Sequence, residues 1–424
     1  MFDRLPVKET TNCQILGEQI VFEHAGIVAN NRFIKAPLTE LKAFYNKNNL
    51  ITHAAPNDKL INIYSKWGNG FFGLIITGNN LVDENHIEGH GNVIIEQEWD
   101  SIERRQQFKK LAIAAKSDGA LLIGQLNHCG KKTTFQYNEA PKSSSSKQHL
   151  DLYDTTSKFG QPVPLEINEI KEVINKYAYA ANFLYKCGYD GVEIHSTFEF
   201  LLASFISPNI NDRNDEYGGT FENRSRLLRE IYEAIRCKVN NRKFLVGLKI
   251  SPFDFVNEAN SVDDALELSV MVEDLGFDYV QLSGGFHEKW EIDVECQANI
   301  SDYSTKFANA FKSNLHKTKI FSVGGYRTVK RMVDAVKEDN FDGISIGRPI
   351  TQEPNLPKNI LDNQVQSTSI HQSNECNFLL AMKMCWVQLE GMGLRHFDKT
   401  DNNPCADIPD YSKKEIADKI LKAL

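Results

Sequence analysis

Eight short apolar segments recur along the chain, and within each of them the hydrophobic character is nearly continuous rather than alternating. Such segments are typical of strands that are buried on both faces of a parallel sheet. They lie at residues 32–37, 73–77, 120–126, 191–195, 244–250, 278–283, 319–325 and 342–348. We therefore predict eight strands at these positions.

Helical patterns lie between several of the predicted strands. Apolar residues recur at three- and four-residue steps in segments 99–118, 169–187 and 261–275, and a glycine follows each segment. Strands that alternate with helices form a parallel sheet, and eight such units close into a (β/α)₈ barrel of the α/β class. A doubly wound sheet stays open from the count alone, although no G-x-G-x-x-G motif follows an early strand.

Three segments fall outside this rhythm. Residues 12–25 predict an N-terminal hairpin that covers the bottom of the barrel, whereas residues 131–165, with four consecutive serines and several prolines, predict a long loop. After residue 352 a proline-containing connector leads into a helical tail. We expect one domain, in which residues 1–360 form the barrel with its hairpin and residues 361–424 form a C-terminal helical extension.

Composition and charge narrow the range of partners. The 424 residues are 41% hydrophobic and 25% charged, and their formal net charge of −8 argues against nucleic acids and anionic membranes. No apolar run reaches the roughly 18 residues of a membrane span, and the N-terminus lacks a signal-peptide pattern. The eight cysteines include no C-x-x-C pair. Without a signal peptide or a membrane span, we expect a cytoplasmic protein. We expect no bound metal, because His86 and His90 form only a weak metal-binding pattern.

Polar residues and glycines follow the predicted strands, where the active site of a (β/α)₈ barrel lies. Gly324, Gly325 and Gly347 would let backbone N–H groups approach a phosphate, and Arg348 adds a planar cation that suits phosphate oxygens. The alternative is that these glycines only shape turns and Arg348 is a surface charge. Their position after the last two strands favours the phosphate site.

Four further strand-end residues have both a functional and a structural interpretation. Lys249 lies in an apolar strand, so it needs an anionic partner or an open site, and beside a flavin it would stabilise the anionic reduced ring. Gln125 offers donors and an acceptor to the amide edge of a heterocycle, and Thr39 offers a hydroxyl to a ring carbonyl. His195 offers a donor to a substrate oxygen. Each of them, taken alone, also fits a buried or capping role.

Eight motifs occur in order along the chain. They are NRFIKAPLTE (31–40), GLIITGN (73–79), IGQLNHCGKK (123–132), GYDGVEIHS (188–196), SPNINDRNDEYGGTFENRSR (207–226), VGLKIS (246–251), SVGGYRT (322–328) and DGISIGRP (342–349). Together they resemble the old yellow enzyme family of FMN-dependent NAD(P)H oxidoreductases over about residues 12–360. The resemblance implies a barrel that binds FMN noncovalently, takes hydride from NADH or NADPH and reduces a small organic acceptor. It indicates the short form with no second flavin domain, and it leaves the oligomeric state open.

The resemblance also implies which residues bind the cofactor. The flavin ring would contact Ala36, Pro37, Leu38, Thr39 and Asn79. Its pyrimidine edge would contact Gln125 and Lys249. Its phosphate would contact Gly324, Gly325, Gly347 and Arg348.

The substrate side departs from the family pattern. By resemblance, His195 is the first of two residues that hold the substrate oxygen, but Phe198 stands where the family has His or Asn. Phe200 stands where the family has the tyrosine that protonates the substrate. Glu199, the nearest alternative acid, would point away from the side of Phe200 on a regular element.

These departures widen the choice of function. We expect hydride transfer to an activated alkene, a quinone or a nitro compound. A flavin-dependent dehydrogenase or isomerase is one alternative, and a flavin-binding barrel with little ene-reductase activity is another. A flavin-free barrel enzyme that binds a sugar phosphate in the same cradle is a third.

Overall fold

Eight parallel strands close into a barrel in the computed structural model, which describes residues 2–148, 158–251, 261–283, 311–338, 341–372 and 378–424. The order around the barrel is β3-β13-β12-β11-β10-β9-β6-β4, and a β3–β4 pairing closes it. Their bounds are β3 Phe33–Lys35, β4 Leu74–Leu81, β6 Leu121–Asn127, β9 Gly191–Ser196, β10 Leu245–Ile250, β11 Tyr279–Ser283, β12 Lys319–Val323 and β13 Gly343–Ile346. This closure confirms the predicted (β/α)₈ barrel and excludes the doubly wound sheet, which has two open edges.

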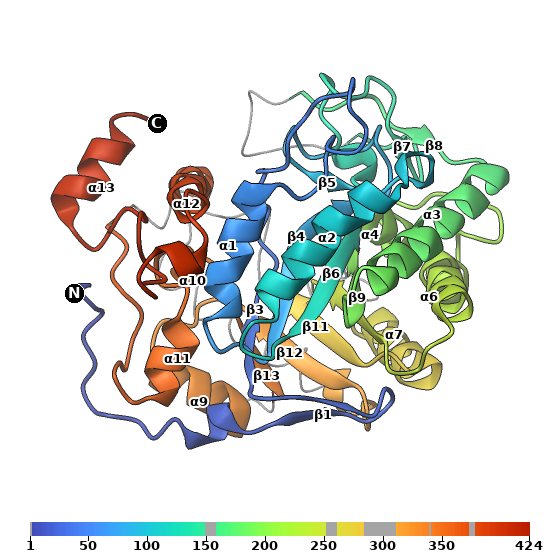
Figure 1. Cartoon of the computed structure of the whole chain (residues 1–424). Helices are drawn as coiled ribbons and strands as arrows, with labels where there is room; N and C mark the ends of the chain where they lie inside the picture. Colours follow the sequence, from blue (N-terminus) through green and yellow to red (C-terminus); the bar gives the residue numbers. More distant parts are fainter. Residues whose placement is uncertain (1, 149–157, 252–260, 284–310, 339–340, 373–377) are drawn as a thin grey trace.

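Helices surround the barrel (Figure 1). The three predicted helices are present within a few residues, as α2 (Ile102–Ala115), α3 (Ile167–Lys186) and α7 (Ser261–Leu275). Local capping explains where α2 begins, because the Ser101 side chain accepts a hydrogen bond from the backbone N–H of Arg104. Among the described residues, the other helices between barrel strands are α1 (Asp58–Gly68), α4 (Leu201–Ile206), α5 (Phe221–Arg224), α6 (Arg226–Val239) and α9 (Val329–Lys337).

The N-terminal hairpin lies later in the chain than the expected residues 12–25. It consists of β1 (Ile20–Phe22) and β2 (Ile27–Ala29), because the 3₁₀ turn η1 (Gln14–Gly17) occupies the earlier part. Ile20, Phe22, Ala25 and Ala29 pack with the buried Ile34, Leu74, Ile123, Leu245 and Phe321 of the barrel strands. The hairpin thus closes the N-terminal end of the barrel, as expected, and β1 crosses below the strands in Figure 1.

Two further segments line the rim of the barrel. The expected loop of residues 131–165 contains two short paired strands, β7 (Lys142–Ser143) and β8 (Val163–Pro164), and begins next to the turn η3 (Gly130–Lys132). Residues 149–157 of that loop lie outside the described part. Between β4 and β6, β5 (Val93–Ile94) pairs with β4 and precedes the turn η2 (Gln97–Trp99).

Helices follow the last strand and gather on one side of the barrel. They are α10 (Pro349–Gln352), α11 (Leu356–Leu361), α12 (Phe378–Met392) and α13 (Lys414–Leu421), with a turn η5 (Phe397–Lys399). Helix α12 packs against α1 and α10, as Figure 1 shows. Among the described helices, none combines the length and the apolar character needed to cross a membrane.

Candidate functional site

A row of polar side chains runs across three neighbouring strands near the C-terminal end of the barrel. Strand register places Asn79 beside Gln125 and Gln125 beside Glu193. All three are buried, and the Gln125 amide nitrogen donates to Glu193 Oε1 over 2.7 Å. Asn79 and Gln125 therefore lie together, as the strand positions predict, and Glu193 joins them as an unpredicted carboxyl.

A second row lies next to the first. Register aligns His195 with Lys249, and Lys249 with Gln281. Lys249 is 6% exposed, and burial lowers its pKa, whereas the negative charge of Glu193 raises it. Burial in turn raises the pKa of Glu193 to about 7, against the opposing effect of Lys249. When ionised, Glu193 is thus an anionic partner for Lys249, one of the two environments expected for this lysine.

The raised pKa of Glu193 makes the stability of the protein depend on pH. A carboxyl whose pKa is higher in the folded state than in the unfolded chain binds protons preferentially when folded. Its stabilising contribution is complete below its unfolded pKa, about 4.5, and is lost as the pH rises to about 7. The loss amounts to at most about 3 kcal/mol, because each pKa unit corresponds to about 1.36 kcal/mol.

We expect Glu193→Gln to remove this dependence, because glutamine keeps an oxygen for Gln125 and carries no titrating proton. Urea unfolding between pH 4 and pH 8 measures the effect on the apoprotein. The difference in unfolding free energy, variant minus native, should grow as the pH rises from about 4.5 to about 7 and level off above that. A difference that stays constant over this range contradicts the assigned shift.

A buried network supports the segment that follows β3. Glu40 Oε1 accepts hydrogen bonds from the hydroxyl of Tyr64 over 2.6 Å and from the backbone N–H of Gly78 over 3.2 Å, and Lys35 Nζ lies 3.4 Å away. A side chain at Gly78 would meet the Glu40 carboxylate and the backbone oxygen of Leu38. From the C-terminal extension, Trp386 Nε1 donates to the carbonyl oxygen of Thr39 over 2.8 Å. The segment 36–40 is therefore held on two sides.

Thr39 and Asn79 meet a further carboxyl at this site. Asn79 Nδ2 donates to Glu88 Oε2 over 2.8 Å, and the Thr39 hydroxyl lies 3.5 Å from Glu88 Oε1. Desolvation raises the pKa of Glu88, while the hydrogen bonds from Asn79, Asn92 and Thr39 lower it. Glu88 lies in the loop between β4 and β5, where the sequence analysis identified no site residue.

The substrate side of the predicted site is aromatic. The ring of His195 lies 5.0 Å from that of Phe200 in an edge-on arrangement and 5.8 Å from that of Phe198. Burial and the charge of Lys249 lower the pKa of His195 well below its usual range, so its imidazole is neutral near pH 7. Its Nδ1 atom is buried and has no hydrogen-bond partner among the described residues.

The loop after β9 directs Glu199 elsewhere. Phe198 and Glu199 both have positive φ angles, 59° and 57°, which non-glycine residues adopt at a cost. The Glu199 carboxylate lies 3.0 Å from the buried Lys131 ammonium. Its negative charge is thus engaged in an ion pair with Lys131, and the absence of a proton-donor role for Glu199 stays a prediction.

The glycines after β12 leave an open surface. Gly324 and Gly325 have φ angles of 126° and 73°, and a Cβ added to either would meet no atom within 4 Å. Arg348 follows β13 and begins α10, and its side chain lines a pocket with Arg327, Gln352 and Ser369. Because β12 pairs with β13, the exposed glycines and Arg348 follow neighbouring strands, and this combination suits a phosphate. The buried amides and Lys249 suit a polar ring edge. These residues fit FMN.

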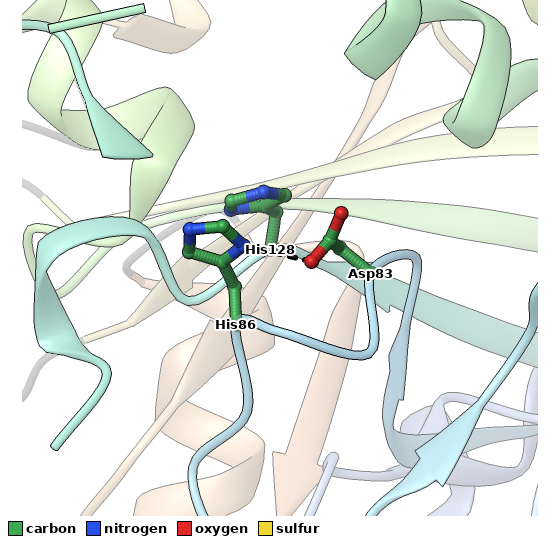
Figure 2. Close-up of side chains that lie close together, drawn as sticks. All are labelled: Asp83, His86 and His128. Atoms are coloured by element: carbon green, nitrogen blue, oxygen red, sulfur yellow. Dashed lines mark hydrogen bonds and ion pairs between the residues drawn. The ribbon is translucent and has the colours of Figure 1, made fainter. Parts of the chain in front are cut away.

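His86 does not pair with His90, the arrangement considered in the sequence analysis. It lies instead with Asp83 and His128, and Figure 2 shows the three side chains turned toward one another. His90 is exposed and stacks on Tyr45. The sequence pattern missed this grouping because His128 follows a different strand.

Hydrogen bonds account for the cluster of Asp83, His86 and His128. His86 Nδ1 lies 2.7 Å from Asp83 Oδ1, and its Nε2 accepts from the backbone N–H of Lys142 over 2.9 Å. Lys176 Nζ lies 2.7 Å from the other Asp83 oxygen. Because both imidazole nitrogens of His86 are engaged and a cation shares Asp83, the cluster ties the loop after β4 to its neighbours.

Glu193, Glu88 and Trp386 contact the site but were not predicted from the sequence, for different reasons. Glu193 had a signal, because an acidic residue inside an apolar strand demands a partner. Glu88 lies in a polar loop, and Trp386 lies in the helical tail, so neither stands out in its local sequence.

Comparisons with known proteins cover most of the chain. Residues 26–366 match the NADH:flavin oxidoreductase / NADH oxidase family. A NADH-dependent flavin oxidoreductase of Aspergillus parasiticus is 37% identical over 89% of this chain and 85% of its own length. Another of that description, from Hypocrea jecorina, is 29% identical over 80% of this chain and 87% of its own. The structure of an old yellow enzyme homologue from Zymomonas mobilis superposes with a TM-score of 0.68 at 21% identity, covering 84% of this chain and 94% of that one.

Proposed function

Because the chain belongs to the NADH:flavin oxidoreductase / NADH oxidase family, the old yellow enzyme family, we propose that it transfers a hydride from NADH or NADPH through FMN to a small organic acceptor. The observation that carries this proposal is the grouping of Asn79, Gln125 and Lys249 at the C-terminal end of the barrel. Two amides on adjacent strands, with a buried cation two strands away from Gln125, match the polar edge of a flavin.

The residues at this site have distinct roles in the proposed reaction. When bound, FMN would supply the hydride-transfer chemistry. Lys249 and Gln125 bind the pyrimidine edge, where the charge of Lys249 favours the reduced, anionic ring. Arg348 and the backbone of Gly324 bind the phosphate. His195, neutral and buried, donates a hydrogen bond from one ring nitrogen to the acceptor's oxygen.

The aromatic wall formed by Phe198 and Phe200 restricts the choice of acceptor. Neither ring provides a proton or a hydrogen bond, so reduction of a C=C bond lacks a positioned acid at these two positions. Quinones and nitro compounds take up electrons at heteroatoms, to which water delivers the proton. We therefore propose that such compounds are better acceptors than simple enones.

The purified protein should be yellow, and heat should release a flavin that mass spectrometry identifies as FMN. Anaerobic stopped-flow mixing with NADH and with NADPH in turn should bleach the flavin absorbance and show which nicotinamide is the reductant. A colourless protein that also fails to bind added FMN contradicts the proposed function. FMN added back to the heat-treated, refolded apoprotein provides the binding control.

A further inference from the structure

Glu88 occupies the centre of a small hydrogen-bonded group beside the candidate flavin site. Its Oε2 atom accepts from Asn79 Nδ2 over 2.8 Å and from Asn92 Nδ2 over 3.1 Å. The backbone N–H groups of Glu88 and Gly89 donate to Asn92 Oδ1 over 3.1 and 3.0 Å. Asn92 thus bonds to both the backbone and the side chain of this turn, which holds the Glu88 carboxyl in place.

This contact decides which atom of the Asn79 amide is available. Because Asn79 Nδ2 donates to Glu88, the amide oxygen Oδ1 is turned away from Glu88. That oxygen is buried and has no hydrogen-bond partner within the described part of the chain. A buried, unpaired carbonyl oxygen costs free energy unless a ligand donates to it. Asn79 is therefore prepared to accept a hydrogen bond.

The neighbouring strand repeats the arrangement. Gln125, the register partner of Asn79, gives its amide nitrogen to the carboxyl of Glu193. Each of the two amides is thus oriented by its own carboxyl. Lys249 lies close enough to both carboxyls for its positive charge to act on them.

We propose that Glu88 is a positioning residue of the cofactor site, which orients the Asn79 amide so that its oxygen accepts a hydrogen bond from the flavin ring. This inference rests on the proposed function, since it requires FMN in the site. The oxidised flavin ring has a single N–H group, at N3 of the pyrimidine edge, between two carbonyl groups. If the Asn79 amide were reversed, its NH₂ group, a donor, would face the N3–H donor of the flavin. N3–H would then lose the Asn79 oxygen as its acceptor.

The affinities of the apoprotein for FMN and for N3-methyl-FMN, which lacks the N–H donor, test the proposal without any measurement of turnover. The variant Glu88→Met keeps a similar side-chain length but removes the acceptor for Asn79. We expect its preference for FMN over N3-methyl-FMN to fall by about three- to tenfold relative to the native protein, the size of one net hydrogen bond. Fluorescence quenching of either flavin on binding provides the readout.

Two further variants separate orientation from simple packing. Glu88→Gln keeps an oxygen that accepts from Asn79, so it should retain most of the native preference. Glu84→Gln removes a partly exposed carboxyl of the same loop, which lies 3.9 Å from Lys47, and should leave the preference unchanged. A preference that is equal in the native protein and in Glu88→Met overturns the proposal.

Asn79→Ala provides an independent check if Glu88→Met does not fold, as judged by thermal unfolding. It removes the accepting oxygen itself and should reduce the preference for FMN to the same extent. An unchanged preference in Asn79→Ala also overturns the inference. If Glu88→Met or Asn79→Ala keeps the native preference while the native protein binds FMN, the role of Glu88 is refuted but the proposed function stands. If the native protein binds neither FMN nor N3-methyl-FMN, the proposed function is refuted as well.

Discussion

Phe200→Tyr should raise the turnover of a simple enone such as cyclohexenone by about 100-fold, the lower end of what a positioned acid contributes. The Phe200 ring is 7% exposed and lies edge-on to His195, the residue that we propose holds the acceptor's oxygen. A tyrosine there adds a hydroxyl on the same side of the site without changing the ring. Reduction of the flavin by nicotinamide should be unchanged, because only the oxidative half-reaction needs this proton.

Stopped-flow measurement of the two half-reactions separates these effects. The native protein should reduce quinones or nitro compounds faster than cyclohexenone, and the variant should narrow that difference. Phe71→Tyr, at an exposed position just before β4, is the matched control and should change neither half-reaction. If the native protein already reduces cyclohexenone as fast as quinones, and Phe200→Tyr brings no gain, another group is the acid.

Arg348→Ala should weaken FMN binding by about ten- to a hundredfold, because a hydrogen bond to a charged group contributes about 1.5–3 kcal/mol. Arg348 lies two residues after the end of β13 and is partly exposed, and β13 pairs with β12, which Gly324 and Gly325 follow. Equilibrium titration of the apoprotein with FMN measures the loss.

Riboflavin provides the internal control for Arg348, since it has the flavin ring but no phosphate. The variant should bind riboflavin as tightly as the native protein does. An equal loss for both flavins would mean that the substitution disturbs the fold of the site. An unchanged affinity for FMN would mean that the Arg348 side chain serves only the neighbouring pocket that it lines with Arg327 and Gln352.

Local sequence was sufficient for the strands and for the end of the barrel at which several of the proposed site residues lie. A strand that is covered on both faces must be apolar along its length, so each barrel strand is recognisable from its own residues. The position of a residue at the end of such a strand then places Gln125, His195 and Lys249 at one end of the barrel. The apolar surroundings of Lys249 also called for an anionic partner or an open site, and the charges of Glu193 and Glu88 act on it.

The hairpin shows where local sequence was insufficient. Its predicted position at residues 12–25 was wrong by several residues, because the pattern does not show which apolar residues face the barrel. Contact of Ile20 and Phe22 with interior residues such as Leu74 and Phe321 fixes the position of β1, and that contact exists only once the barrel has closed.

The partners of the site residues depend on tertiary structure for the same reason. Trp386 and Thr39 are 347 positions apart, and Glu88 reaches Asn79 only through the path of the loop after β4. Hydrogen bonds of this kind depend on distance and angle, which the closed barrel and its docked C-terminal helix set. The sequence shows that phenylalanine stands at positions 198 and 200. Their packing on His195 depends on the turn after β9, which brings both rings near the imidazole.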